Sequence, residues 1–210
     1  MAESSRKHAR WFPHVNAVNP SRTMRAWLTD RMSLTAKLIA HSRHFRVCPL
    51  QQRRALSLAD EYAAIHLPRR LPVRERDVLL QCDGRAVVYA HTVVPLHDTA
   101  ADWPFFRTLG SRSLGSALFS DPLIDRGALQ FARLLAGHPL IKRAEQALGM
   151  NFASASLFAR RCLYRRKHGH LLVTEVFLPA IADLTAMKGK PPMINEYSST
   201  LKQGIDESAF

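Results

Sequence analysis

A largely apolar segment near the end of the chain, Leu171 to Ala180 (LLVTEVFLPA), carries a single carboxylate, Glu175. Its β-branched and aromatic residues favour a strand, which Pro179 would end. Alternation puts three apolar residues on the same face as Glu175: Leu171, Val173 and Phe177. The other face carries Leu172, Val176 and Leu178, so neither face looks solvated. Glu175 must therefore be paired, protonated or reserved for a ligand, because an unpaired buried carboxylate is costly.

The clearest predicted element runs from Arg76 to Pro95. Two extended, β-branched segments meet at Asp83-Gly84, which is a strong signal for an antiparallel hairpin. In the first strand, Arg76 begins an apolar row that continues through Val78, Leu80 and Cys82. The sequence therefore predicts a second charge on a buried face.

The remaining pattern predicts short helices and further strands. The helices are expected from a cap at Asn19 or Ser21 through Leu28, and at Ser33–His41, Trp103–Leu109, Ser113–Phe119 and His138–Leu148. The strands are expected at His44–Leu50 and Leu123–Leu134, with a last hairpin pairing Leu157–Tyr164 with Leu171–Leu178 around a Lys167–His170 turn. Gln51–Val73 is ambiguous. Hairpins with inserted helices indicate an α+β domain whose antiparallel sheet has helices on one side.

The chain length suits one domain, which we place at 1–185, followed by a polar tail, 186–210, that we expect to be disordered. Thirty Lys and Arg against seventeen Asp and Glu give a formal net charge of +13. That charge favours nucleic acid, anionic lipid or a small anionic substrate, and cannot choose among them. The basic residues are dispersed and we interpret them as solvated surface, as in Arg6-Lys7, Arg53-Arg54, Arg69-Arg70, Arg160-Arg161 and Arg165-Arg166-Lys167.

Other classes of protein lack support. Cys48, Cys82 and Cys162 have no CxxC spacing, so we expect reduced thiols and neither a disulfide framework nor a zinc site. His168 and His170 in a turn are read as solvent-exposed, and no metal site is predicted. The HExxH, GxSxG, GxGxxG and P-loop motifs do not occur. Without an apolar leader or a long apolar run, the protein is expected to be cytoplasmic and not membrane-spanning.

The two charges predicted on apolar strand faces, Arg76 and Glu175, allow several interpretations. Arg76 at a strand start could extend its guanidinium to water, or it could form a buried ion pair with Glu175. In a third interpretation both face one cavity, where Arg76 clamps a carboxylate and Glu175 handles a hydroxyl or a proton. The short helix opening around Leu114 packs Leu114 and Leu118 inward, or its amides help to shape a small pocket.

Taken together, these segments resemble the chorismate pyruvate-lyase family. The resemblance rests on WL with SLTAKL (Trp27–Leu38), on Arg76–Gly84, and on TVVP (Thr92–Pro95). It continues through the LG pairs of Leu109–Phe119, Arg160-Arg161 and LLVTEVFLPA, in that order, and covers about Trp11 to Asp183. The chain departs from compact members by an extra segment at about 133–156 and by both tails. A surface helix is the expectation for that segment.

The resemblance implies an antiparallel sheet flanked by helices around a small buried ligand cavity. It also implies conversion of chorismate to 4-hydroxybenzoate and pyruvate, the first committed step of ubiquinone biosynthesis, without metal or cofactor. Carried over, the family's catalytic and substrate-binding residues fall on Arg76 and Glu175, and its leucine contact falls on Leu114. A flap methionine of some members aligns with Leu34, which keeps size and apolarity. Both a proton transfer by Glu175 and an internal transfer to the leaving enol fit the sequence.

Under this interpretation Arg76 holds the ring carboxylate, and Glu175 binds the 4-hydroxyl group. The expected partner of Glu175 is therefore the ligand, and Glu175 is not expected to form a structural salt bridge. The expected partners are chorismate and its product, with no obligatory nucleic acid, and the expected state is a monomer. The alternative is a ligand-sensing domain of the same fold, as in GntR-type regulators. Those carry an upstream DNA-binding domain, for which the matched region leaves no room, and this favours the enzyme.

Overall fold

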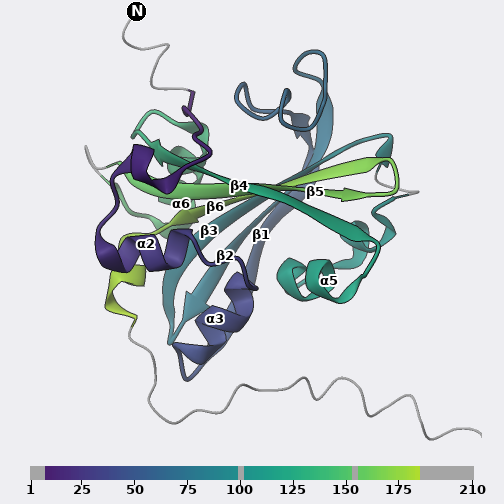
Figure 1. Ribbon diagram of the computed structural model, residues 1–210. Coiled ribbons are helices and arrows are strands. Elements are labelled where there is room, and N and C mark those ends of the chain that lie inside the picture. The colour runs from purple at the N-terminus through teal and green to yellow at the C-terminus, as the bar shows by residue number, and fades with distance from the viewer. Residues whose placement is uncertain (1–7, 99–101, 153–155, 185–210) are drawn as a thin grey trace, which may run out of the picture.

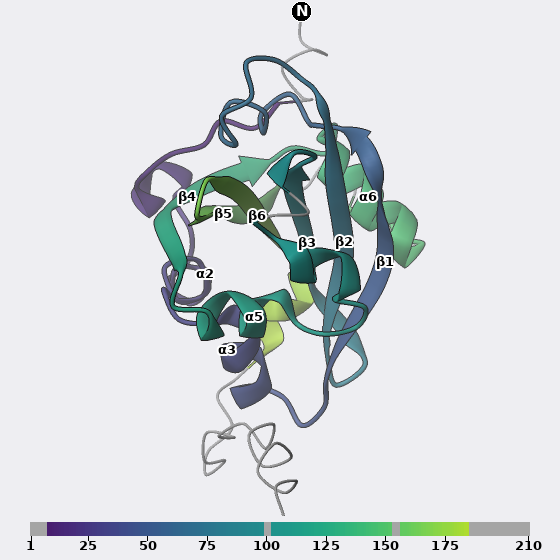
Figure 2. The same cartoon turned by 90° about the vertical axis from the view of Figure 1, so that its right-hand side faces the viewer.

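The fold is one curved, fully antiparallel sheet with helices on both of its faces. The computed structural model describes residues 8–98, 102–152 and 156–184. The six strands are β1 (Phe45–Leu56), β2 (Pro72–Cys82), β3 (Arg85–Pro95), β4 (Ile124–Leu134), β5 (Leu157–Arg166) and β6 (Gly169–Phe177). They pair in the order β1-β2-β3-β6-β5-β4, and Figure 2 shows the sheet wrapping around its inner face. The predicted α+β class is confirmed.

The helices are short. They are α2 (Arg22–Leu28), α3 (Leu34–Ala40), α5 (Leu114–Ser120) and α6 (Pro139–Leu148), with 3-10 turns at Val15–Val18, Pro104–Thr108 and Pro179–Asp183. Ser21 and Ser33 cap α2 and α3 by accepting the backbone N–H of Met24 and Ala36. Both caps lie where the sequence predicts a helix start. None of the described helices is long and apolar enough to cross a membrane.

The first hairpin forms because its turn can adopt left-handed backbone. Asp83 and Gly84 have φ of 49° and 80°, the combination that a tight two-residue turn between twisted strands requires. The Asp83 side chain also accepts the backbone N–H groups of Arg43 and His44, and so fixes the entry to β1. The predicted hairpin is confirmed, although β2 already begins at Pro72. The ambiguous stretch after Gln51 continues β1 to Leu56.

The hydrophobic core is split between the two faces of the sheet. On the inner face, α2 and α3 pack on β2, β3 and β6 through residues such as Leu28, Leu38 and Val78. On the outer face, α6 packs through Leu140, Ile141 and Ala144. Figures 1 and 2 show α6 on the opposite side of the sheet from α3 and α5. The prediction of helices on one side only is therefore wrong, because the apolar stripe of α6 covers a second hydrophobic face.

Part of the segment 133–156 packs on the outer face of the sheet. Its helix α6 is amphipathic, with an apolar stripe against the sheet and Gly149 in left-handed conformation at its end. Residues 153–155 and the expected tail lie outside the described residues. The segment thus supplies a cover for the outer face of β3, β5 and β6.

Candidate active site

A cavity on the inner face gathers all four predicted site residues. Arg76 reaches it from β2, Glu175 from β6, Leu34 from α3 and Leu114 from α5. The wall is otherwise largely apolar, with Val78, Leu80, Ala90, Leu129 and Val173 among its members. The structure therefore places Arg76 and Glu175 on one shared cavity, as in the third interpretation of the sequence.

The strand register sets the separation between the two charges. Arg76 is opposite Thr92 on β3, which in turn is opposite Val173 on β6. Glu175 therefore lies two strands away from Arg76 and two residues along, or roughly 10 Å across and roughly 7 Å along the sheet at the backbone. Among the described residues no ion pair joins them. The separation leaves room for a small ring between the two side chains.

Arg76 is buried and retains unused hydrogen-bond donors. It is 3% exposed, and its Nη2 donates to the backbone carbonyls of Gly110 and Arg112, at 2.9 and 3.2 Å. No carboxylate of the described residues pairs with it, and burial lowers its pKa from the ordinary value. Since Nε and Nη1 have no protein partner in the described part of the chain, the guanidinium can still donate hydrogen bonds to a carboxylate.

Glu175 is half of an ion pair, which corrects the expectation that its partner would be the ligand alone. Its Oε2 accepts the Nε–H of Arg160 at 2.5 Å, directly across from it on β5. Arg160 also donates from Nη1 to the carbonyls of Trp27, Leu28 and Asp30, at 3.1, 3.3 and 2.7 Å. Arg160 is buried, with 2% of its surface exposed. It fixes Oε2 of Glu175, whereas Oε1 has no hydrogen-bond partner among the described residues.

Arg160 is a site residue that the sequence interpretation missed. It was assigned to solvated surface with Arg161, and both are buried. Arg161 donates to Gln130 and to the backbone of Asp60 on the other face. The predicted pairing of Leu157–Tyr164 with Leu171–Leu178, aligned end to end, already puts Arg160 opposite Glu175, as the structure does. The register of the last hairpin was the signal that could have found it.

The cavity carries an excess of positive charge. Three arginines, Arg76, Arg126 and Arg160, and one carboxylate, Glu175, line it. Because Arg160 is neutralised by Glu175, two guanidinium groups remain without a carboxylate of the described residues. The polar hydroxyls at the wall are those of Thr35, Thr92, Ser113 and Tyr164. This charge suits a small ligand with two negative groups.

Two segments meet over the cavity. The start of α3 touches the start of α5, where the hydroxyl groups of Thr35 and Ser113 form a hydrogen bond of 2.6 Å. A Cβ on Gly115 would lie only 3.1 Å from Thr35 Oγ1, so the glycine permits this close approach. Figure 2 shows α3 and α5 side by side on the inner face. Leu34 and Leu114 lie at the starts of these two helices and cover the ligand space with apolar side chains.

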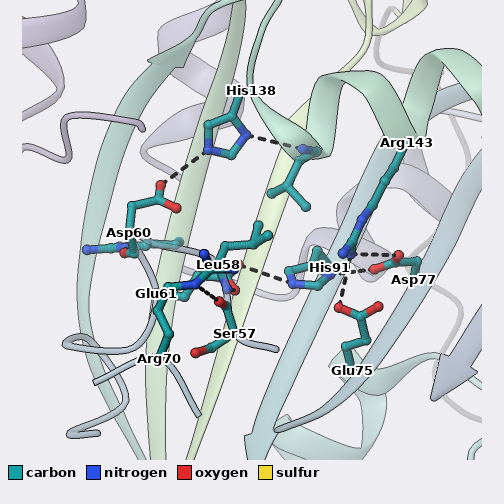
Figure 3. Close-up of polar contacts among 12 residues, drawn as sticks. Ser57, Leu58, Asp60, Glu61, Arg70, Glu75, Asp77, His91, His138 and Arg143 are labelled. Atoms are coloured by element: carbon teal, nitrogen blue, oxygen red, sulfur yellow. Dashed lines mark hydrogen bonds and ion pairs between the residues drawn. The ribbon is translucent and has the colours of Figure 1, made fainter. Parts of the chain in front are cut away.

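A separate buried polar cluster lies on the outer face, around Asp77 and His91 (Figure 3). His91 binds Asp77 through Nδ1, and its Nε2 lies 3.1 Å from Glu61 Oε1. Arg143 of α6 reaches Glu75 and Asp77 from Nη1, at 3.1 and 3.3 Å. Although burial opposes the charge, Glu61 and Asp77 raise the pKa of His91 to about 10, and the pKa of Asp77 is lowered. This cluster fixes β2 against β3 and α6.

Metal ligation is not indicated by the side chains that the structure describes. No three His, Cys, Asp or Glu residues within 8–98, 102–152 and 156–184 lie close enough to hold a metal ion. Cys48, Cys82 and Cys162 are free thiols. The ring of His170 lies against that of His66, with centroids 4.4 Å apart.

Solved structures share the fold at low sequence identity. The chain is similar to PhnF from Mycobacterium smegmatis, with a TM-score of 0.51 and 15% identity over 77% of this chain and 71% of PhnF. It is also similar to the C-terminal domain of the histidine utilization repressor from Pseudomonas syringae pv. tomato. There the TM-score is 0.50 and the identity 10%, over 70% of this chain and 98% of that domain. These similarities concern the fold alone.

Sequence relatives are much closer. A family model described as chorismate lyase matches residues 5–186. A probable chorismate pyruvate-lyase of Ralstonia nicotianae is 51% identical over 80% of this chain and 85% of the relative. A protein of the same description from Cupriavidus metallidurans is 46% identical over 81% of this chain and 80% of its own length. The protein therefore belongs to the chorismate lyase family.

Proposed function

We propose that this protein is a chorismate pyruvate-lyase, which converts chorismate to 4-hydroxybenzoate and pyruvate at the inner cavity. The observation that carries the proposal is the placement of Arg76 and Glu175 at separate positions of one apolar cavity with excess positive charge. Chorismate is a small dianion with a ring carboxylate and, across the ring, a hydroxyl group. The close relatives carry the same description.

In the proposed complex, Arg76 holds the ring carboxylate with N–H groups that its two backbone contacts leave free. Its Nη2 is already fixed to two backbone carbonyls, so the guanidinium is oriented before the ligand arrives. A hydrogen bond from a guanidinium to a carboxylate is charge-assisted, and it is therefore short and strong. Arg76 thereby orients the ring along the cavity.

Glu175 accepts a hydrogen bond from the 4-hydroxyl group through Oε1. Arg160 holds the other oxygen, so the carboxylate cannot rotate away. The Arg160–Glu175 pair thus combines a structural contact and a ligand contact. Leu34 and Leu114 close the cavity above the ring and exclude water.

The reaction needs little more from the protein than this positioning. The C–H bond at the hydroxyl-bearing carbon and the neighbouring C–O bond of the enolpyruvyl ether both break. The C–H electron pair completes the aromatic ring, and the ether oxygen leaves with the C–O pair, takes up a proton and becomes the enol of pyruvate. Because the product is aromatic, a fixed conformation and a dry, charge-complementary site suffice.

Turnover of chorismate tests the proposal. Purified protein with EDTA should release pyruvate and 4-hydroxybenzoate in equal amounts, detected by a coupled dehydrogenase and by chromatography. Absence of both products at saturating chorismate would refute the proposal. Loss of turnover with EDTA, restored by a divalent ion, would contradict only the expectation that no metal is needed.

A further inference from the structure

Arg126 also lines the cavity, but it takes no part in the proposed contacts to the ring carboxylate and the 4-hydroxyl group. It lies on β4, four strands away from Arg76 in the sheet order, and reaches the same cavity because the sheet curves. None of the described carboxylates forms an ion pair with it. Burial alone would lower its pKa, but Tyr164, Cys162 and Glu175 raise it above the ordinary value. The cavity therefore holds a permanently charged group with no anionic partner among the described residues.

A β-bulge turns the Arg126 side chain toward the cavity. Arg126 is opposite Tyr164 and Leu129 is opposite Cys162, so three residues of β4 match two of β5. In regular alternation Arg126 and Leu129 would face opposite sides, yet both line the cavity. Gly127 permits the bulge, since a Cβ there would lie 2.9 Å from the carbonyl oxygen of Leu163. The local backbone is built to present this arginine inward.

The position of Arg126 is next to the more open side of the cavity. Its guanidinium stacks over the ring of Phe119, 5.1 Å from the centroid. Phe119 and Met32, both cavity-lining, are 44% and 71% exposed. The stacking leaves the edge of the guanidinium, with its N–H donors, available to an anion.

We propose that Arg126 binds the carboxylate of the enolpyruvyl side chain and so distinguishes the dianionic substrate from the monoanionic product. The inference rests on the proposed function and extends it to the second negative charge of the ligand. Arg76 and Glu175 hold groups that substrate and product share, whereas the side-chain carboxylate leaves with pyruvate. Loss of this contact therefore weakens retention of the substrate without affecting the aromatic product.

Ligand binding separates this role from a general electrostatic one. Three ligands that do not react are titrated by calorimetry against the wild type and Arg126→Gln. They are 3-(carboxymethoxy)-4-hydroxybenzoate, which carries a side-chain carboxylate, the uncharged-side-chain analogue 3-ethoxy-4-hydroxybenzoate, and 4-hydroxybenzoate itself. Arg126→Gln should weaken the first roughly 10- to 100-fold and leave the other two within about twofold.

Arg133→Gln is the matched control. Arg133 lies on the same strand and stacks over Phe158, 4.7 Å from the centroid, but it is exposed and does not line the cavity. The control should change none of the three affinities by more than about twofold at physiological salt. Unchanged binding of 4-hydroxybenzoate to Arg126→Gln also shows that the variant is folded.

The outcomes are distinct. Equal weakening of all three ligands by Arg126→Gln, or the same loss with Arg133→Gln, would overturn the proposal, as would an unchanged affinity for the carboxymethoxy ligand. A wild type that binds these ligands but does not turn over chorismate would contradict the proposed function and leave the comparison of ligands valid. Failure of the wild type to bind any of them would refute both.

Discussion

Glu175 is held by Arg160 on one oxygen and is open to a ligand on the other. Its substitution by alanine and by glutamine should therefore have different effects on stability. Glu175→Ala leaves Arg160, 2% exposed, without its carboxylate, which should cost about 3–5 kcal/mol in the free energy of unfolding. Glu175→Gln keeps the shape and an oxygen for Arg160, and should cost less. Urea unfolding of both variants measures the difference.

The two variants also separate stability from activity. Glu175→Gln should lower kcat/KM for chorismate by about 100-fold while the protein stays folded, since a neutral amide is a weaker acceptor for the hydroxyl group. Full activity of Glu175→Gln would contradict the role given to this carboxylate. Equal stability of the alanine and glutamine variants would contradict the structural importance of the pair.

The candidate site was predictable wherever a charge interrupted an apolar strand face. Arg76 and Glu175 were found in this way, and Leu34 and Leu114 came from the resemblance to the family. Arg160 was missed because adjacent basic residues usually lie on the surface, although the predicted hairpin already placed it opposite Glu175. Arg126 was missed because a bulge reverses which face it occupies.

At the scale of elements, the hydrogen bond between Thr35 and Ser113 joins α3 to α5 over the cavity. Ser113→Ala and Thr35→Val should each loosen this junction and lower kcat/KM several-fold, because water then reaches the site more often. In a double-mutant cycle the two changes should show a coupling of about 1 kcal/mol in the free energy of unfolding. Strictly additive effects would show that the bond contributes nothing.

The outer cluster gives the sheet a pH-dependent stability. The pKa of His91 is about 10 in the folded protein and near 6.5 when unfolded, so the folded state binds the proton more tightly. The resulting stabilisation is complete below about pH 6.5 and is lost as the pH rises toward 10. Asp77 and Glu61 face the imidazolium. Arg143 of α6 forms ion pairs with Asp77 and Glu75 and so offsets their negative charge.

His91→Gln tests this linkage. The variant should be less stable than the wild type by about 3–5 kcal/mol near pH 6, because two buried carboxylates lose their cation. That gap in the free energy of unfolding should narrow steadily between pH 6.5 and 10. Chemical denaturation at several pH values measures it, and a gap that stays constant over this range would contradict the protonated state of His91.

The elements themselves were mostly visible in the sequence. Asp83-Gly84 predicted the first hairpin, and Ser21 and Ser33 predicted the helix starts that the structure shows. The side of the sheet that each helix covers was not predictable, because an amphipathic stripe says that a helix packs and not against which face. For α6 the deciding partners, among them Tyr89 and Val176, come from strands far away in the sequence.

At the scale of the whole molecule, the net charge of +13 should attract a dianionic substrate over a distance. The apparent kcat/KM for chorismate should fall several-fold between about 20 and 300 mM ionic strength, while kcat changes little. Stopped-flow or initial-rate assays at constant pH measure both quantities. An unchanged kcat/KM across this range would show that the surface charge plays no part in substrate capture.

Conversion of chorismate at the inner cavity can be checked by comparing the wild type with Arg76→Gln. The wild type should form pyruvate and 4-hydroxybenzoate one to one. In Arg76→Gln, kcat/KM should fall by about 100-fold or more, and the binding of 4-hydroxybenzoate should weaken in parallel. A wild type without turnover, or a folded Arg76→Gln variant with full activity, would contradict the account.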